Sequence, residues 1–374
     1  MLHGYVATDK FTGAASIPKY QTSTFDLKKG YIDNTEYNYT RFSNPTVRAL
    51  EEAIVSLEDS KFGFSFASGM GAISSALMLA KASEHIIFPS DVYGGTYQFA
   101  TEIVPRYGIE TSFVDYSDIS NIEKAINSKT KIIYIETPSN PLMKVSDIKQ
   151  ITSLAKKNGL LTIADNTFMT SLYQKPLDLG CDIVVESLTK FINGHSDVVG
   201  GLLATNNKII AEEITLFQKN FGAILGVEDA WLVLRGIKTM GIRMEKSINN
   251  ASKIANFLSK NPKIKTVYYP SLKYHQKNDI QLDQACNGGA VLSFELNNSS
   301  KLASFVQSLK LPIYAVSLGG VESILSHPAT MSHACLSAEE RKKQGITDGL
   351  LRLSCGIEET EDLIADLTQA LEKI

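Results

Sequence analysis

Short apolar runs bounded by turn residues recur through the middle of the chain. Seven of them lie between residues 62 and 206, and segments with helical spacing of apolar residues separate them. They read FGFSFAS (62–68), HIIFPS (85–90), TSFVDY (111–116), KIIYIET (131–137), LLTIADN (160–166), DIVVES (182–187) and GGLLATN (200–206). Apolar strands that alternate with helices are typical of a parallel sheet covered on both faces. The pattern therefore predicts an α/β fold with a mostly parallel seven-stranded sheet.

One intervening segment, SDIKQITSLAKKNG, shows the helical type clearly. Ile148 and Ile151 fall on one helical face, Ser146 or Asp147 can cap the start, and Gly159 can end the helix. The next apolar run follows at once, as a strand–helix–strand unit requires.

The two ends of the chain have different patterns. Residues before about 61 are polar and rich in turns, which is typical of an extended arm. Beyond about 245 we expect a helix at 251–261, strands at 265–272 and 290–296, a helix at 301–309 and a final helix at 359–374. We therefore predict an N-terminal arm (1–60), a large domain (61–245) and a smaller α+β domain (246–374).

Composition and charge narrow the classes of protein. The 374 residues include 37 Lys and Arg against 40 Asp and Glu, and no long basic run could follow a phosphate backbone. No stretch approaches about 18 uninterrupted apolar residues, and the start, MLHGYVATDK, lacks the features of a signal peptide. We expect a cytoplasmic protein that binds neither nucleic acid nor membrane.

The cysteines argue against a zinc site and a disulfide framework, because they are far apart and form no Cys-x-x-Cys pair. We expect buried thiols in a reducing compartment, and no metal site. The four are Cys181, Cys286, Cys335 and Cys355.

A small turn between a strand and a helix, ASGMGAISSALMLA (67–80), is a candidate anion site. Backbone N–H groups at a helix start and the helix dipole attract phosphate. Gly69 and Gly71 alternatively only permit a tight turn. The segment is neither a G-x-G-x-x-G fingerprint nor a P-loop, so dinucleotide and P-loop binding lose support.

A lysine directly after a buried strand, in ESLTKFINGHSD (186–197), is a candidate for covalent chemistry. Desolvation disfavours the charged form of Lys190, and a neutral amine can form an imine with a carbonyl. Ser187 and Thr189 fall on one side of an extended segment and could both donate to a phosphate. The simpler alternative is an edge lysine flanked by two capping hydroxyls.

Two more polar residues follow predicted strands. Asp165 ends the run LLTIAD, and carboxylates at the ends of parallel strands face the ligand crevice of open α/β sheets. Tyr93 lies in DVYGGT, where it could stack on a flat ring or carry a proton. A turn acid and a surface aromatic are the alternatives. A phosphate turn, an aromatic, an acid and a lysine together are the parts needed to hold pyridoxal phosphate.

Eight segments in order resemble the pyridoxal-phosphate-dependent Cys/Met metabolism family, which includes the cystathionine lyases and synthases. They are YNYTRFSNPT, FASGMGAISS, DVYGGT, IETPSNP, ADNTF, ESLTKFINGHSD, VSLGGVESILSHPATMSHA and GLLRLSCGIE. The resemblance covers nearly the whole chain. It implies fold type I of the pyridoxal-phosphate enzymes, similar to aspartate aminotransferase, and a homotetramer built as a dimer of dimers.

The resemblance also implies a cofactor site. Lys190 corresponds to the lysine that binds the cofactor covalently and Asp165 to the partner of the pyridinium nitrogen, while Tyr93 corresponds to the tyrosine that stacks on the ring. Gly69, Met70, Ser187 and Thr189 correspond to the phosphate ligands. Tyr39 and Arg41 match the pair that a neighbouring subunit contributes, so the arm would complete a partner's site.

The substrate site follows in the same way. Arg352 corresponds to the arginine that holds the substrate α-carboxylate, with Asn140 and Ser317 beside it. A guanidinium suits this task because its fork binds a carboxylate through two parallel hydrogen bonds.

The resemblance favours a cystathionine β-lyase, which releases homocysteine, pyruvate and ammonia. Several γ-acting relatives carry an acidic residue where this chain has Val316, and methionine γ-lyases carry a cysteine at the position of Gly95. Some β-lyases carry a tyrosine at 316, so the valine departs from them too. The alternatives are a cystathionine γ-lyase, a γ-synthase or O-acetylhomoserine sulfhydrylase, and a regulator that binds the cofactor without catalysis.

Overall fold

Two β-sheets organise the chain, which a computed structural model describes over residues 3, 8–9, 11–28, 37–334 and 336–374. Part of the predicted arm, and Cys335, therefore lie outside the described residues. The seven predicted apolar runs all form strands of one sheet. These strands are β1 (Phe62–Phe66), β2 (His85–Pro89), β3 (Glu110–Val114), β4 (Thr130–Glu136), β5 (Leu161–Asp165), β6 (Ile183–Ser187) and β7 (Gly201–Thr205).

The strand order in this sheet is β1-β7-β6-β5-β4-β2-β3. Neighbours from β6 to β3 pair in parallel, whereas β7 runs antiparallel to both β1 and β6. The prediction of a mostly parallel seven-stranded sheet is confirmed. The order brings the carboxyl ends of β4, β5 and β6 to one edge, where ligands bind in open α/β sheets.

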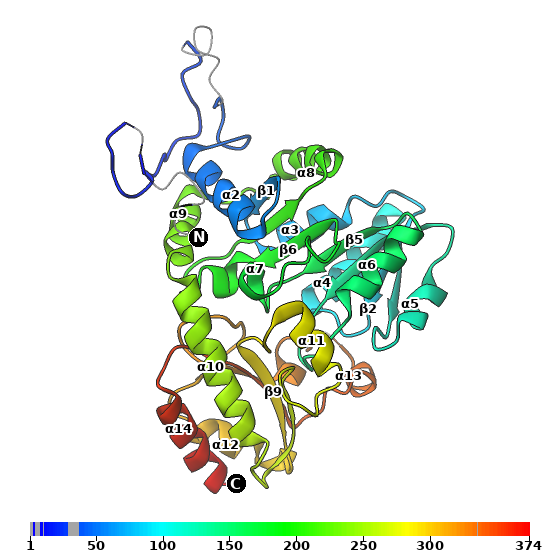
Figure 1. The fold of residues 1–374 in the computed structure, drawn as a ribbon, viewed down its shortest axis with the longest axis vertical. Helices are drawn as coiled ribbons and strands as arrows, with labels where there is room; N and C mark the ends of the chain where they lie inside the picture. Colours follow the sequence, from blue (N-terminus) through cyan, green and yellow to red (C-terminus); the bar gives the residue numbers. More distant parts are fainter. Residues whose placement is uncertain (1–2, 4–7, 10, 29–36, 335) are drawn as a thin grey trace.

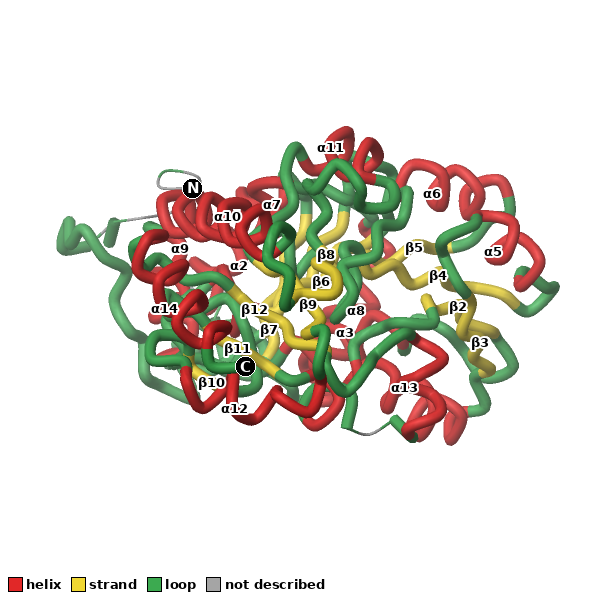
Figure 2. Tube along the Cα trace, turned by 90° about the horizontal axis from the view of Figure 1, so that it is seen from below, coloured by secondary structure: helices red, strands yellow, loops and turns green. Residues whose placement is uncertain are grey.

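Helices cover both faces of the large sheet. One face packs against α3 (Gly69–Leu77) and α8 (Lys208–Phe221). The other packs against α2, α5, α6 and α9, and Figure 2 shows α5 and α6 along one side of β2, β4 and β5. Their bounds are α2 (Pro45–Glu58), α5 (Ile119–Ala125), α6 (Ile148–Lys157) and α9 (Val227–Ile237). Short turns at α4 (Gly94–Gln98), η1 (Phe99–Ile103), η2 (Val104–Tyr107), α7 (Thr170–Tyr173) and η3 (Leu188–Ile192) complete this part.

Local sequence sets the helix ends. The Asn44 side chain accepts a hydrogen bond from the N–H of Thr46 at 2.9 Å, and Pro45 occupies the first helical position of α2. In α6 the cap is Asp147, one of the two predicted residues, and Gly159 takes a left-handed φ of +67° just beyond the end.

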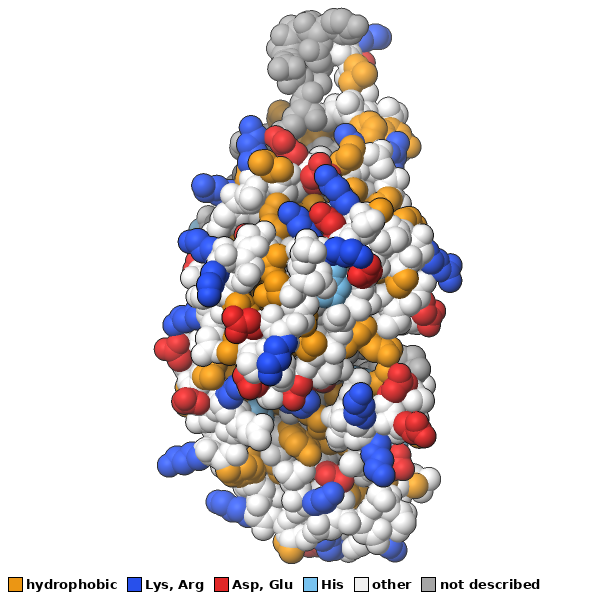
Figure 3. Space-filling model, turned by 90° about the vertical axis from the view of Figure 1, so that its right-hand side faces the viewer, with side chains coloured by type: hydrophobic (Ala, Val, Ile, Leu, Met, Phe, Trp, Pro, Cys, Tyr) orange, Lys and Arg blue, Asp and Glu red, His pale blue; other side chains and the backbone are white. Residues whose placement is uncertain are grey.

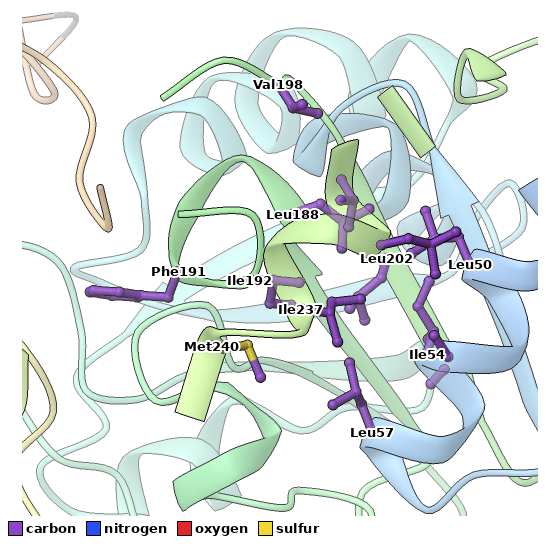
Figure 4. Packing of buried hydrophobic residues seen from close by; sticks show 14 of the residues in the cluster. Leu50, Ile54, Leu57, Leu188, Phe191, Ile192, Val198, Leu202, Ile237 and Met240 are labelled. Carbon is purple, nitrogen blue, oxygen red and sulfur yellow. The ribbon is translucent and has the colours of Figure 1, made fainter. Parts of the chain in front are cut away.

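A packed apolar cluster joins α2 and α9 to the large sheet (Figure 4). Leu50, Ile54 and Leu57 of α2 face Leu202 of β7 and Ile237 of α9. Because α2 is fixed in this way, its last residue, Glu58, lies inside the protein with only 1% of its surface exposed.

A second, five-stranded sheet has the order β10-β11-β12-β9-β8 and is antiparallel except for the β10–β11 pair. Its strands are β8 (Ile264–Tyr268), β9 (Val291–Leu296), β10 (Ile313–Tyr314), β11 (Ile324–Ser326) and β12 (Leu350–Ser354). Around it lie α10 (Met240–Leu258), α11 (Asn278–Ala285), η4 (Ser299–Lys301), α12 (Leu302–Ser308), η5 (Pro328–Thr330), α13 (Ala338–Gln344) and α14 (Thr360–Glu372). The predicted smaller α+β unit is confirmed, and α10 extends from the large sheet to it in Figure 1.

The surface carries both signs of charge. Figure 3 shows Lys and Arg interspersed with Asp and Glu over one face. Within the described residues no helix is both long enough and apolar enough to cross a membrane, and no cluster of three or more His, Cys, Asp or Glu side chains has the arrangement of a metal site.

The prediction of buried thiols was wrong for one cysteine. Cys181 and Cys355 are buried, but Cys286 is exposed because it caps α11 in a left-handed conformation at the surface.

Candidate active site

A cavity of about 540 Å³ lies where the carboxyl ends of β4, β5 and β6 meet the start of α3 and strand β12. Ten residues proposed from the sequence line it, although they come from positions 69 to 352 of the chain. They are Gly69, Met70, Tyr93, Asn140, Asp165, Ser187, Thr189, Lys190, Ser317 and Arg352.

The turn before α3 is tightly packed. The Ser68 side chain caps α3 by accepting from the N–H of Gly71 at 3.0 Å. A side chain at Gly69 would lie 3.2 Å from Ser187 Cβ, and one at Gly201 would come within 2.8 Å of the Gly69 backbone. Glycine at these positions lets the helix start approach β6 and β7, and the first residues of α3, Gly69 and Met70, line the cavity where a helix start can bind an anion.

Lys190 lies in a kinked turn, η3, directly after β6, with φ −94° and ψ −134° interrupting the helical conformation. Its ammonium group donates to Ser317 Oγ at 2.6 Å. Burial, and secondly the charge of Arg352, lower the pKa of Lys190 to about 8. The prediction that Ser187 and Thr189 lie on one extended segment was wrong, because strand β6 ends at Ser187 and the turn η3 begins directly after it. The Thr189 hydroxyl accepts a hydrogen bond from Gly200 N at 3.0 Å.

Asp165 ends β5 as a buried acid. Its carboxylate accepts from Thr167 N at 3.0 Å and from the Tyr134 hydroxyl at 3.2 Å. Burial raises the pKa of Asp165, and no cation is among the groups that shift it. A positively charged ring nitrogen in the cavity would supply the missing partner.

Arg352 is buried on β12 and is held from three sides. It donates to Asn140 Oδ1 at 2.9 Å, to the Ser317 carbonyl at 2.8 Å and to Ser326 Oγ at 3.2 Å. Its Nε has no hydrogen-bond partner among the described residues, so the guanidinium keeps a buried donor for a ligand. Ser317 takes a φ of +85°, which is a strained backbone conformation for a serine and is typical of functional sites.

Tyr39 and Arg41 lie outside this cavity. Arg41 donates to the carbonyl of Lys219 on α8 at 2.7 Å, and Tyr39 packs its ring edge-on against Phe42. In Figure 1 much of the described segment before α2, in blue, lies beyond α2 and α9. Within one chain these two residues do not contribute to the site.

Glu136 is a cavity residue that the sequence analysis missed. It ends β4 beside Asp165 in register, and its carboxylate accepts from Tyr93 N at 2.9 Å and from Asn140 N at 3.3 Å. Burial, and secondly the charge of Asp165, raise the pKa of Glu136 well above its ordinary range. The signal was present, since Glu136 ends a parallel strand as Asp165 does.

The model of the Cys/Met metabolism PLP-dependent enzyme family matches residues 1–372. The chain belongs to this family. The predicted family, fold type and enzyme class are thereby confirmed, and pyridoxal 5'-phosphate is the cofactor of its members. The residues present fit this group, because they combine a helix start for a phosphate, a buried acid without a cation and a lysine with a lowered pKa.

The family relatives include both β- and γ-acting enzymes. Cystathionine β-lyase MetC of Bacillus subtilis is 49% identical over the whole chain and 96% of the relative. Cystathionine γ-lyase of the same organism is 47% identical over the whole chain and 98% of the relative. The crystal structure of cystathionine γ-lyase from Lactobacillus plantarum complexed with L-serine superposes with a TM-score of 0.96 at 41% identity, covering 100% of this chain and 97% of that one.

Proposed function

We propose that this family member cleaves L-cystathionine at Cβ and, with one water consumed, releases homocysteine, pyruvate and ammonia. The support is a lysine of lowered pKa that lies next to a buried arginine with a free Nε donor, in one cavity. The 49% identity to cystathionine β-lyase MetC of Bacillus subtilis adds support for cleavage at Cβ.

The chain's own residues divide the work. Arg352 binds the substrate α-carboxylate with Asn140 beside it, and the amine of Lys190 removes the proton from Cα. Asp165 would hold a proton on the ring nitrogen of the bound cofactor, and Tyr93 would stack on the ring. When bound, pyridoxal phosphate supplies an electron-withdrawing ring that stabilises negative charge at Cα.

The mouth of the cavity favours Cβ cleavage over the γ-reactions. Val316 lines it, is 64% exposed, and offers no charge to the distal amino group of the substrate. The acids Glu136, Asp165 and Glu186 line the cavity too, but all three belong to buried strand ends of the large sheet.

Cystathionine γ-lyase is the second candidate, and the γ-lyase relatives of similar identity favour it. One assay separates the two. Purified holoenzyme with cystathionine is expected to yield pyruvate and homocysteine, whereas 2-oxobutyrate and cysteine would assign γ-cleavage. Lys190→Ala, which lacks the amine, serves as the blank. A wild-type protein that gives neither pair of products would contradict both candidates.

We further propose a homotetramer with shared sites and a cytoplasmic location. Support for sharing comes from Tyr39 and Arg41, which lie outside their own chain's cavity beside the exposed Phe42. The division into an arm (1–60), a large domain (61–245) and a small domain (246–374) is part of the same proposal. The exposed thiol of Cys286 suits a reducing compartment.

A further inference from the structure

Two buried carboxyl groups face each other on the side of the large sheet opposite α3. Glu58 ends α2 and Glu186 precedes Ser187 on β6, and their exposed fractions are 1% and 2%. Neighbouring side chains of a strand point to opposite faces, so Ser187 approaches Gly69 of α3 while Glu186 points toward α2. Each carboxyl is among the groups that shift the pKa of the other, so the two lie close together.

The donors around the pair are too few for two charged carboxylates. Glu186 Oε1 accepts from Asn166 Nδ2 at 2.9 Å. The other three oxygens of the pair accept no hydrogen bond among the described residues, and the hydroxyl that lies near Glu58, that of Ser171, is also unpaired there. Two buried carboxylates that lack donors would repel each other and lose their hydration, whereas one proton between them turns the contact into a strong hydrogen bond.

We propose that Glu58 and Glu186 share one proton and form a positioning pair that joins α2 to β6 and holds the Asn166 amide beside Asp165. The charge of Asp165 opposes ionisation of Glu186, whereas Lys175 and the Ser171 hydroxyl favour the charged form of Glu58. Lys175 does not neutralise the pair, because its ammonium group forms an ion pair with Asp59.

The pair connects two parts of the proposed site. Asn166 directly follows Asp165, and its amide also donates to the Gln174 carbonyl at 2.8 Å and accepts from Gln174 Nε2 at 3.0 Å. Helix α2 begins directly after the segment that carries Tyr39 and Arg41. The effect on Asp165 rests on the proposed function, whereas the shared proton does not.

The pair is sensitive to pH in a defined direction. Burial raises the pKa of Glu58 to about 7 and that of Glu186 well above its ordinary range. A carboxyl whose pKa is higher in the folded state favours folding at low pH. This contribution falls as the pH rises above the unfolded value of about 4.3. The pair therefore holds more than one proton only in acid, keeps the single shared proton around pH 7, and loses this link between α2 and β6 when that proton is released at higher pH.

The test uses Glu186→Gln, which has the same shape and cannot ionise, with Glu52→Gln on the more exposed side of α2 as control. The infrared spectrum of the wild-type holoenzyme at pH 7 is expected to contain a carbonyl stretch of a neutral carboxylic acid that is lost in E186Q and kept in E52Q. It is read from the difference between spectra, because Glu136 also has a raised pKa and contributes equally to all three proteins. Thermal unfolding midpoints are then compared between about pH 5 and 8. E186Q should gain stability relative to wild type as the pH rises, whereas E52Q should follow wild type.

Positioning is tested by cofactor retention. Glu186→Ala removes one of the two acceptors of the Asn166 amide and is expected to weaken cofactor retention roughly tenfold, whereas E186Q keeps that acceptor. Glu58→Gln provides a second variant, in which the acid band should persist at a shifted frequency.

The proposal would be overturned if the unfolding midpoints of wild type and E186Q changed in parallel with pH and their infrared spectra showed no difference in the neutral-acid band. So would stabilisation of wild type by KCl or NaCl that E186Q loses, because that result would assign a bound cation. Both outcomes are read without any measurement of turnover, so they are independent of the reaction that the holoenzyme catalyses.

Discussion

At the residue scale, the amine of Lys190 differs from a surface lysine because burial lowers its pKa to about 8. The neutral amine is the nucleophile, so covalent capture of pyridoxal phosphate by cofactor-free protein should accelerate as the pH rises to about 8 and then level off. Stopped-flow absorbance between pH 6 and 10 measures this rate. A surface lysine would still gain speed at pH 9, since its pKa is about 10.4. Lys190→Ala should show no covalent capture.

Glu136 carries the second prediction at this scale. Glu136→Ala leaves the N–H groups of Tyr93 and Asn140 without acceptors, at a cost of about 1–3 kcal/mol for each buried donor. Because Asn140 accepts a hydrogen bond from Arg352, KM for the substrate should rise roughly tenfold, and kcat should fall by less. Steady-state kinetics and the circular dichroism of the bound cofactor measure the change.

Glu136→Gln is the matched variant, since it keeps one carbonyl acceptor and should lose less than the alanine. An E136A enzyme with the wild-type KM would show that the two hydrogen bonds do not position the substrate site.

The residues that the sequence could identify are those with one demanding chemical role. Lys190 and Asp165 follow apolar strands, where a charged group needs a reason, and both line the cavity. Glu136 also ends an apolar strand, but Asp165 already accounted for the one acid that the cofactor's ring nitrogen requires. The strained φ of Ser317 and the free Nε of Arg352 depend on contacts across distant segments, which no local pattern encodes.

At the element scale, strand β7 must pass close to the turn that opens α3. A side chain at Gly201 would lie within 2.8 Å of the Gly69 backbone, so Gly201→Ala is expected to push the turn away from β6. Cofactor retention should fall and the unfolding midpoint should drop, because overpacking of a buried contact costs about 1–3 kcal/mol.

Gly226→Ala is the control for this substitution. Its new side chain would meet only Asp229, at 3.5 Å, and its φ of −70° suits alanine. If G201A kept the cofactor as well as G226A does, the close approach of β7 would not matter for the phosphate site.

Elements were predictable where burial imposes a long pattern. All seven apolar runs of the large sheet became strands because both of its faces are covered. The antiparallel direction of β7 was not predictable, because an apolar run reads the same in either direction. Strands β10 and β11 have two and three residues, which are too few for an alternation to register.

At the scale of the whole molecule, the near-neutral charge and the mixed surface fit a protein that binds a small zwitterion and a second copy of itself. The proposed assembly places Arg41 of one subunit at the site that contains Lys190 of the other. Neither the net charge nor the sheet order requires that subunits share their sites, so an experiment on mixed subunits is needed to test the sharing.

Two inactive variants should restore activity when their subunits are mixed. Arg41→Ala keeps its own Lys190, and Lys190→Ala keeps Arg41 for its partner, so a hybrid dimer contains one intact site. In a symmetric dimer random mixing makes half of the dimers hybrid, and activity should return to roughly a quarter of the wild-type value. Denaturation and joint refolding of equal amounts, followed by the cystathionine assay, measure it. If each site belonged to one chain, the mixture would show only the average of the two variants.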